Sequence, residues 1–212
     1  MCEECQNYQQ DYDNWSLNTP INRIQRLNAP KLNNVEIEII KSISPINLLD
    51  IGSGDGIRLF DYLSRNQINF TGIEKFERLY NESPYSGNII NCDISDANFS
   101  IENFNDIDTI TILGGSLFGI LCRNCQKTAW KNITNILLKG GHIVFDTPLL
   151  NGFESNESIG EKNLMPGVGP IQFFLSRMEL EKIWRENNLT IVNTQDHIIP
   201  GITLRYYKLQ KN

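Results

Sequence analysis

A glycine-rich turn at residues 48–56, with the sequence LLDIGSGDG, is the stretch of this chain best suited to chemistry. Glycine lets the backbone turn tightly and approach a ligand closely, because no Cβ stands in the way. Apolar residues before the turn predict the end of a buried strand, and the apolar spacing over 57–63 predicts a helix after it. A helix that starts at such a turn points its unpaired N–H groups at the turn's ligand. The arrangement therefore favours a nucleotide-like ligand.

The spacing of the glycines separates two kinds of nucleotide site. In the dinucleotide fingerprint G-x-G-x-x-G, the third glycine would fall at position 57, which is Ile57. Here the run is G-x-G-x-G, and Asp50 stands two residues before its first glycine. This pattern resembles motif I of the class I S-adenosylmethionine-dependent methyltransferases, in the type 11/25 small-domain group. The resemblance implies S-adenosylmethionine as cofactor, S-adenosylhomocysteine as product, and cofactor contacts at Asp50, Gly52, Ser53, Gly54 and Gly56.

Acids after the next two predicted strands extend the resemblance. Glu74 ends the strand predicted over 68–74, where a carboxylate can accept hydrogen bonds from both ribose hydroxyls. In the resembling family, an acid after the third strand binds the adenine amino group and the next apolar residue packs on the ring, which implies these roles for Asp93 and Ile94. Ordinary alternatives are a solvated loop acid for Glu74 and a turn or N-cap residue for Asp93. The other expected cofactor contacts are Lys75, Leu113 and Gly114.

The residues after the fourth and fifth predicted strands bear on the methyl acceptor. Methyltransferases that act on base amines usually carry Asn/Asp-Pro-Pro-aromatic after strand four, whereas this chain has Gly114-Gly115-Ser116. Asp146, which we expect at the carboxyl end of strand 142–146, is the candidate base or substrate-orienting residue. The alternative is that Asp146 caps the next turn. The other expected substrate contacts are Tyr12, Trp15, Arg23 and Ser116.

Two segments are candidates for covering the acceptor. Residues 1–30 are polar and carry Tyr12, Trp15 and Arg23. In the resembling family the N-terminal segment often covers the cofactor and substrate, so the resemblance implies a lid with these three residues as its contacts. An arm whose aromatic residues simply pack on the domain is the alternative. Residues 147–175 form a long stretch rich in glycine and proline, and loops of that length are usually functional or disordered. We expect this stretch to be a substrate cover.

Four of the five cysteines occur as Cys2-x-x-Cys5 and Cys122-x-x-Cys125, the ligand number of a structural zinc site. The two pairs are far apart in the sequence, and Cys2 lies near a terminus. Cys122 and Cys125 also continue the apolar stripe of the helix predicted over 122–138, as small buried residues would. We therefore expect no metal.

The predicted elements give one fold class. Helices are expected over 31–43, 56–65, 122–138 and 176–187, and parallel strands over 47–51, 68–74, 88–92, 107–113 and 142–146. The stretches 189–199 and 202–209 predict a final antiparallel hairpin. Repeated strand–helix units predict a doubly wound, mostly parallel seven-stranded α/β sheet with helices on both faces. Residues 31–212 would form a single methyltransferase domain.

Composition and charge restrict the classes of substrate and the location that are expected for this chain. The chain has 212 residues, 40% of them hydrophobic, and a net charge of −6, which disfavours nucleic acid as the substrate. No apolar run is long enough to span a membrane, and the acidic N-terminus is unlike a signal peptide, so a cytoplasmic location is expected. Three functions remain: a small-molecule methyltransferase, a domain that binds S-adenosylmethionine without turnover, and a protein or RNA methyltransferase. The sequence predicts neither the acceptor nor the oligomeric state.

Overall fold

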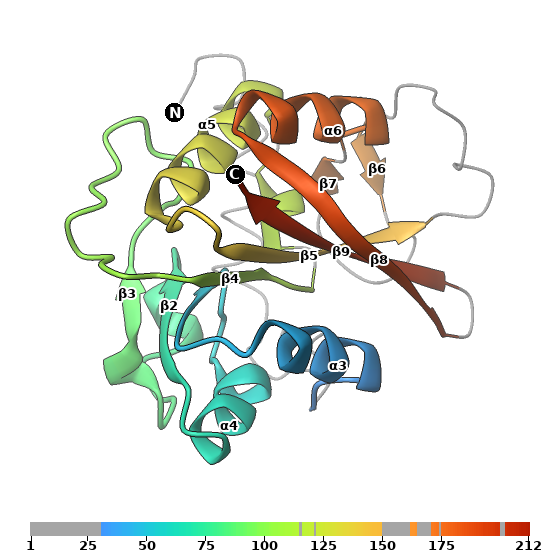
Figure 1. Cartoon of the computed structure of the whole chain (residues 1–212). Coiled ribbons are helices and arrows are strands. Elements are labelled where there is room, and N and C mark those ends of the chain that lie inside the picture. Colours follow the sequence, from blue (N-terminus) through green and yellow to red (C-terminus); the bar gives the residue numbers. More distant parts are fainter. Residues whose placement is uncertain are drawn as a thin grey trace.

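A seven-stranded sheet forms the centre of the fold (Figure 1). The computed structural model describes residues 31–114, 116–120, 122–149, 162–164, 171–173, 175–199 and 202–212. Strands β1 to β5 pair in parallel, whereas β9 pairs antiparallel with both β5 and β8. The order across the sheet is β3 (Ile89–Asn91), β2 (Asn69–Glu74), β1 (Asn47–Ile51), β4 (Thr109–Ile112), β5 (His142–Leu149), β9 (Ile202–Lys211) and β8 (Leu189–Ile199). The carboxyl ends of β1 to β5 therefore share one edge.

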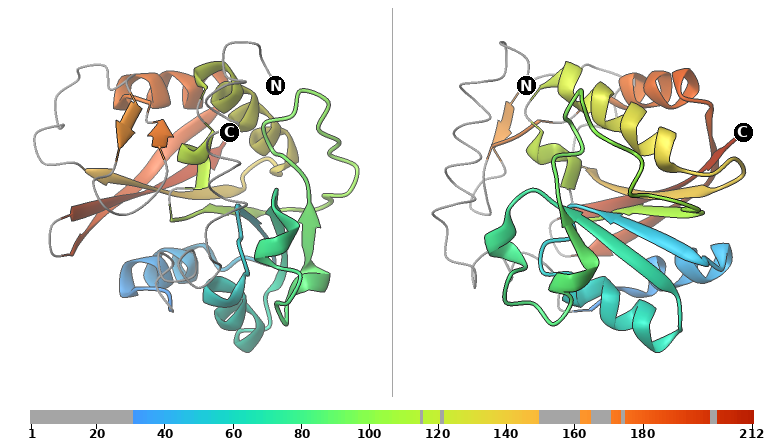
Figure 2. Two further views of the ribbon diagram at one scale, coloured as in Figure 1. Left: turned by 180° about the vertical axis from the view of Figure 1, so that it is seen from behind. Right: turned by 90° about the vertical axis from the view of Figure 1, so that its left-hand side faces the viewer.

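Two pairs of helices cover the two faces of the sheet. Helices α3 (Asn34–Ile43) and α4 (Ile57–Arg65) lie on one face, and α5 (Arg123–Ile136) and α6 (Arg177–Glu186) lie on the other (Figures 1 and 2). Successive strand residues point to opposite faces. Val144 and Tyr206 accordingly belong to the core cluster under α3 and α4, whereas their neighbours Phe145 and Tyr207 belong to the cluster under α5 and α6. The expected α/β fold with helices on both faces is confirmed.

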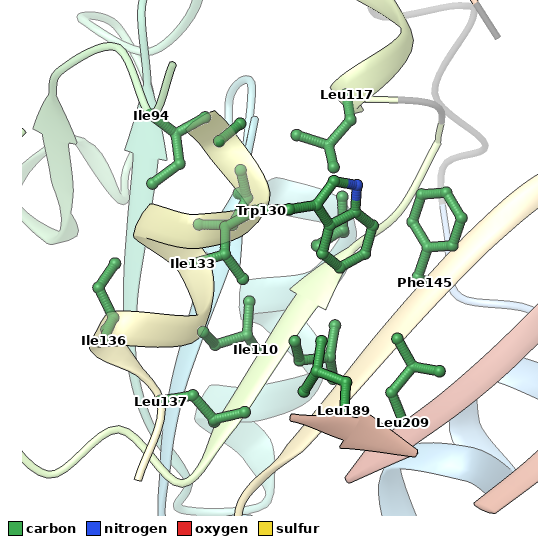
Figure 3. Close-up of a cluster of buried hydrophobic side chains, with 14 of the residues drawn as sticks. Ile94, Ile110, Leu117, Trp130, Ile133, Ile136, Leu137, Phe145, Leu189 and Leu209 are labelled. Carbon is green, nitrogen blue, oxygen red and sulfur yellow. The ribbon is translucent and has the colours of Figure 1, made fainter. Parts of the chain in front are cut away.

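The larger core cluster is built around aromatic rings. The Trp130 ring of α5 lies edge-on to Phe145 of β5 and to Trp184 of α6, with centroid distances of 5.3 and 5.8 Å. Figure 3 shows Trp130 and Phe145 in this cluster, with Leu117 beside them. Leu117 belongs to the 3-10 turn η4 (Ser116–Gly119), so the segment that follows β4 is anchored in the core.

Helices α3 and α6 each begin with a capping box formed by residues three positions apart in the sequence. Ser176 caps α6 and Glu179 completes a capping box, since each side chain bonds to the backbone of the other. A second box opens α3, where Asn33 Oδ1 accepts from the Glu36 N–H at 3.0 Å and Glu36 Oε2 accepts from the Asn33 N–H at 2.8 Å. Both boxes satisfy N–H groups that a helix start leaves unpaired.

The prediction that strands and helices alternate regularly is wrong between β2 and β4. Only the 3-10 turns η2 (Glu77–Leu79) and η3 (Ser86–Asn88) connect β2 to β3, and residues 92–108 between β3 and β4 contain no helix. In this second connection, the carboxylates of Asp93 and Asp96 accept hydrogen bonds from N–H groups two residues later. Such local bonds compete with the helical ones, which explains the irregular path.

Strand β5 is longer than predicted. It continues past Asp146 to Leu149, because β9 remains paired with it as far as Leu149 opposite Thr203. The expected cover, 147–175, therefore begins as strand, and two short antiparallel strands, β6 (Lys162–Leu164) and β7 (Ile171–Phe173), occur within it. The rest of the cover up to residue 174, and the whole of the arm 1–30, lie outside the described residues. No helix in the described part of the chain is long and apolar enough to cross a membrane.

Candidate functional site

The glycine-rich turn lies between β1 and α4, as predicted, and requires glycine at each of its three positions. Gly52, Gly54 and Gly56 have φ values of 70°, 56° and 71°, in the left-handed region that side chains disfavour. A Cβ on Gly52 would also lie 2.6 Å from the Cβ of Ser116. The turn therefore contacts the segment that follows β4, and Ser116, an expected substrate contact, packs directly on it.

Glu74 is buried at the end of β2 and holds the turn in place. Its Oε2 accepts from the Gly54 N–H and its Oε1 accepts from the Phe76 N–H, both at 3.0 Å. Burial raises the pKa of Glu74, although these bonds oppose the shift. Glu74 is thus not a solvated loop acid. The Lys75 N–H also bonds to this carboxylate. A carboxylate has about four acceptor positions, so Glu74 keeps capacity for a further donor.

Asp93 occupies a turn immediately after β3. Its Oδ1 accepts from the N–H and the hydroxyl of Ser95, at 2.9 and 2.6 Å, and its Oδ2 lies 3.4 Å from the ammonium of Lys75. Burial raises the pKa of Asp93, but the Ser95 bonds and Lys75 outweigh it, so the pKa is lowered. The neighbouring Ile94 is 7% exposed and packs under α5 (Figure 3). The turn alternative is therefore present, and the adenine contacts stay predictions.

Asp50 is buried on β1 and lines a cavity next to the turn. Its Oδ1 accepts a 2.6 Å hydrogen bond from the Thr111 hydroxyl of β4. Burial raises the pKa of Asp50 to about 7, even though Thr111 and the nearby Arg58 lower it. The cavity is lined by five expected cofactor residues, Asp50, Gly52, Ser53, Gly56 and Leu113, together with Leu32, Asp55, Arg58 and Leu59.

A buried polar cluster next to this cavity was missed from the sequence. Its centre is the carboxylate of Glu36 on α3, which is fully buried. Glu36 is ion-paired with Arg58 of α4, and its Oε1 accepts from the Tyr206 hydroxyl of β9 at 3.1 Å. The capping box of α3 and the position of Arg58, two residues after the last glycine, are visible in the sequence. Their meeting with Tyr206 is not, because it joins three distant segments.

Asp146 does not end its strand, which corrects the sequence prediction. It lies within β5, is 3% exposed, and accepts a 3.2 Å hydrogen bond from the Gly114 N–H. Gly114 has a φ of 69° and begins the segment after β4. Asp146 thus caps a turn, as the alternative stated, although the turn follows the adjacent strand. Burial, with the charges of Glu36 and Asp146, raises the pKa of the adjacent Tyr206, which therefore stays neutral.

The remaining expected residues divide between described and undescribed parts of the chain. Tyr12, Trp15 and Arg23, and also Cys2 and Cys5, lie outside the described residues. Cys122 and Cys125 are buried at the start of α5. Within the described ranges, no three His, Cys, Asp or Glu side chains gather as metal ligands would.

Comparisons with known proteins agree with this geometry. A family model described as a methyltransferase domain matches residues 21–194. An S-adenosylmethionine-dependent methyltransferase from Clostridium acetobutylicum has a TM-score of 0.63 at 16% identity, covering 95% of this chain and 92% of its own. No curated protein matches the chain in a sequence search.

Two further solved structures have named acceptors. The 1,6-didemethyltoxoflavin-N1-methyltransferase of Burkholderia thailandensis has a TM-score of 0.60 at 17% identity, with 96% of this chain and 84% of that chain covered. CalS10, an amino pentose methyltransferase from Micromonospora echinaspora, has a TM-score of 0.61 at 13% identity, with 82% and 88% covered. At these identities the likeness establishes the shared fold.

Proposed function

We propose that this chain, which belongs to the family of methyltransferase domains, transfers a methyl group from S-adenosylmethionine to a small-molecule acceptor. The enzyme class and the cofactor follow from the family and from the S-adenosylmethionine-dependent enzymes that share its fold. The observation that supports this site is the meeting of the three-glycine turn, Asp50 and Glu74 at one edge of the sheet. The acceptor class is the new part of the proposal.

The cofactor residues act at successive strand ends. Glu74 binds the ribose hydroxyls with the acceptor capacity that its backbone bonds leave free. Asp93 and Ile94, with Lys75, bind the adenine end beyond β2. The turn residues Gly52 to Gly56 and the Asp50 cavity receive the other end of the cofactor. This order extends the cofactor across the carboxyl ends of β3, β2, β1 and β4.

Methyl transfer from a sulfonium is an in-line displacement, so the protein mainly aligns the donor and the acceptor. Asp146 contributes by fixing the backbone of Gly114. We place the sulfonium next to Gly114 and to the nearby Ser116. A base is required only if the acceptor arrives protonated, and Asp146 is the first residue to test for that role. The arm with Tyr12, Trp15 and Arg23 and the cover 147–175 supply the remaining acceptor contacts.

A small acceptor is favoured over nucleic acid by charge. The net charge is −6, and two of the three ionisable residues that line the described cavity, Asp50 and Asp55, are acids. Binding of phosphates would need a basic surface instead. Two proteins of the same fold are named for small acceptors, an amino pentose and 1,6-didemethyltoxoflavin. The rival functions are a binding domain without turnover and a protein or RNA methyltransferase.

Turnover separates these functions. Purified protein is incubated with methyl-labelled S-adenosylmethionine and, in parallel, with a metabolite extract passed through a small-pore filter, with total protein, and with RNA. We expect S-adenosylhomocysteine to form with the filtered extract and the label to appear in a small product. Labelling confined to protein or RNA would contradict the small-acceptor proposal. Binding of the cofactor without any S-adenosylhomocysteine above the protein-free control would support the binding domain.

The ribose contact is tested by Glu74→Gln. We expect S-adenosylhomocysteine binding to weaken by roughly 1–3 kcal/mol, because a charge-assisted pair of hydrogen bonds is lost. Calorimetry with S-adenosylhomocysteine and its 2′-deoxyribose analogue provides the measurement. The wild type should prefer the ribose form, and the variant should lose most of that preference. Glu77→Gln, at an exposed acid on the turn after β2, is the matched control and should change neither affinity. Unchanged affinity in folded Glu74→Gln would place the ribose contact elsewhere.

A further inference from the structure

Arg58 is the cationic side chain among the described residues that line the Asp50 cavity. It lies in the first turn of α4, immediately after the glycine-rich turn. Its side chain is 20% exposed, whereas its ion-pair partner Glu36 is fully buried. The guanidinium thus extends from a buried anchor to the wall of the cavity.

The anchor restrains Arg58 strongly. A buried carboxylate is costly unless it is paired and hydrogen-bonded, and Glu36 satisfies this with the Asn33 N–H, the Tyr206 hydroxyl and Arg58. Tyr206 is itself held, because its hydroxyl accepts a 2.9 Å bond from the Asn33 side chain. Residues from α3, α4 and β9 therefore fix one end of the guanidinium, and little side-chain entropy remains to be lost on binding a ligand.

The same guanidinium keeps unused donors. Glu36 pairs with Nη2, whereas a guanidinium carries five N–H groups. Arg58 Nε is buried and has no hydrogen-bond partner among the described residues. Because Nε is buried, the remaining Nη donors of this 20% exposed side chain are the ones left for a ligand. A planar group with such donors beside a cavity suits an anion that accepts more than one hydrogen bond, above all a carboxylate.

Asp50, whose carboxyl group is opposite in charge to Arg58, also lines the cavity. The two residues line one cavity, so the cavity presents a cation and an acid to the same ligand. An α-amino acid carries a carboxylate and an ammonium on one carbon, which matches this pair of charges. S-adenosylmethionine has such a group at the end opposite its adenine. Residues of β1, of the turn and of the segment after β4 line the cavity, whereas Asp93 follows β3, two strands away from β1.

We propose that the Arg58 guanidinium, positioned by Glu36, binds the α-carboxylate at the methionyl end of the cofactor. The inference rests on the proposed function, since it assigns a residue to the cofactor named there. Arg58 is the binding group and Glu36 is a positioning residue that touches no ligand. The site consequently distinguishes cofactor molecules that carry the carboxylate from those that lack it.

Two ligands test the contact directly. S-adenosylhomocysteine carries both charged groups, whereas S-adenosyl-3-thiopropylamine keeps the ammonium and lacks the carboxylate. By calorimetry we expect the wild type to bind S-adenosylhomocysteine roughly 10- to 100-fold more tightly, the range of one charge-assisted hydrogen-bonded contact. Arg58→Met should remove most of this difference by weakening S-adenosylhomocysteine binding alone. Arg65→Met, at an arginine of the same helix whose side chain is 79% exposed, should retain the wild-type difference.

Separate variants test the positioning role of Glu36 and guard against loss of the fold. Glu36→Gln should reduce the difference between the two ligands in part, because Arg58 loses its charged anchor but stays cationic. If Arg58→Met does not fold, Arg58→Lys keeps the charge without the planar fork and should show a reduced difference. Equal affinity of the wild type for both ligands, or an unchanged difference in folded Arg58→Met, would overturn the assignment and leave the proposed function standing. A wild type that binds neither ligand would contradict the proposed function itself.

Discussion

Replacing Gly54 by valine is expected to abolish S-adenosylhomocysteine binding, with an affinity loss of at least about 100-fold, or roughly 3 kcal/mol. Gly54 has a φ of 56°, which a β-branched residue adopts only with strain, and its N–H donates to Glu74. Valine would therefore displace the turn and release the ribose acid, in addition to placing two methyl groups where the backbone faces the ligand. Calorimetry of the folded variant with S-adenosylhomocysteine measures the loss, and NAD should bind neither protein.

Gly140→Val separates lost binding from lost stability. Gly140 also has a positive φ, of 79°, but it lies in the turn before β5, and a Cβ there would meet no atom within 4 Å. Both variants should lose roughly 1–3 kcal/mol of unfolding free energy through backbone strain. Only Gly54→Val should lose the ligand. Equal binding losses in the two variants would mean that the turn has no special role.

Asp50 is expected to destabilise the cofactor-free protein at neutral and alkaline pH. Burial raises its pKa from 3.8 to about 7, so between these values the folded protein binds more protons than the unfolded chain. The free energy of unfolding then falls as the pH rises from about 4 to about 7, by about 4 kcal/mol for this group. Asparagine does not titrate, so Asp50→Asn should remove that part of the slope. Its amide oxygen can still accept the hydrogen bond from Thr111, so the local contact is kept. Urea unfolding at a series of pH values provides the measurement.

Asp93→Asn is a control of opposite sign. The pKa of Asp93 is lowered, so its stabilising contribution is present at neutral pH and is lost as the pH falls through the folded pKa. Asp93→Asn should therefore weaken the protein at pH 8, where Asp50→Asn strengthens it. The gain from Asp50→Asn should accompany weaker S-adenosylhomocysteine binding, because the cofactor ammonium loses its carboxylate. An unchanged pH slope in Asp50→Asn would show that other groups, such as Glu74, cause the dependence.

Local patterns account for the parts of the fold that the sequence predicted well. Helices α5 and α6 and the buried strand β1 each depend on residues close together in the chain. The same holds for the turn, where alternating glycines correspond to three positive φ angles. The errors occurred where tertiary pairing or side-chain competition decided the outcome. Strand β5 extends because β9 pairs with it, and the segment after β3 is irregular because Asp93 and Asp96 bond locally.

The sequence by itself determined the cofactor class and the glycine-rich turn between β1 and α4, because a strand–glycine–helix unit is encoded within a few residues. Only the tertiary structure decided that Asp146 caps the segment after β4 and that Glu36, Arg58 and Tyr206 meet beside the Asp50 cavity. Those contacts join α3, α4, β4, β5 and β9, and no pattern within one segment specifies which distant side chain will satisfy a buried charge. Leaving such a charge buried and unpaired would raise the free energy of the folded state, so the paired arrangement is favoured. The pairing is therefore a property of the folded chain.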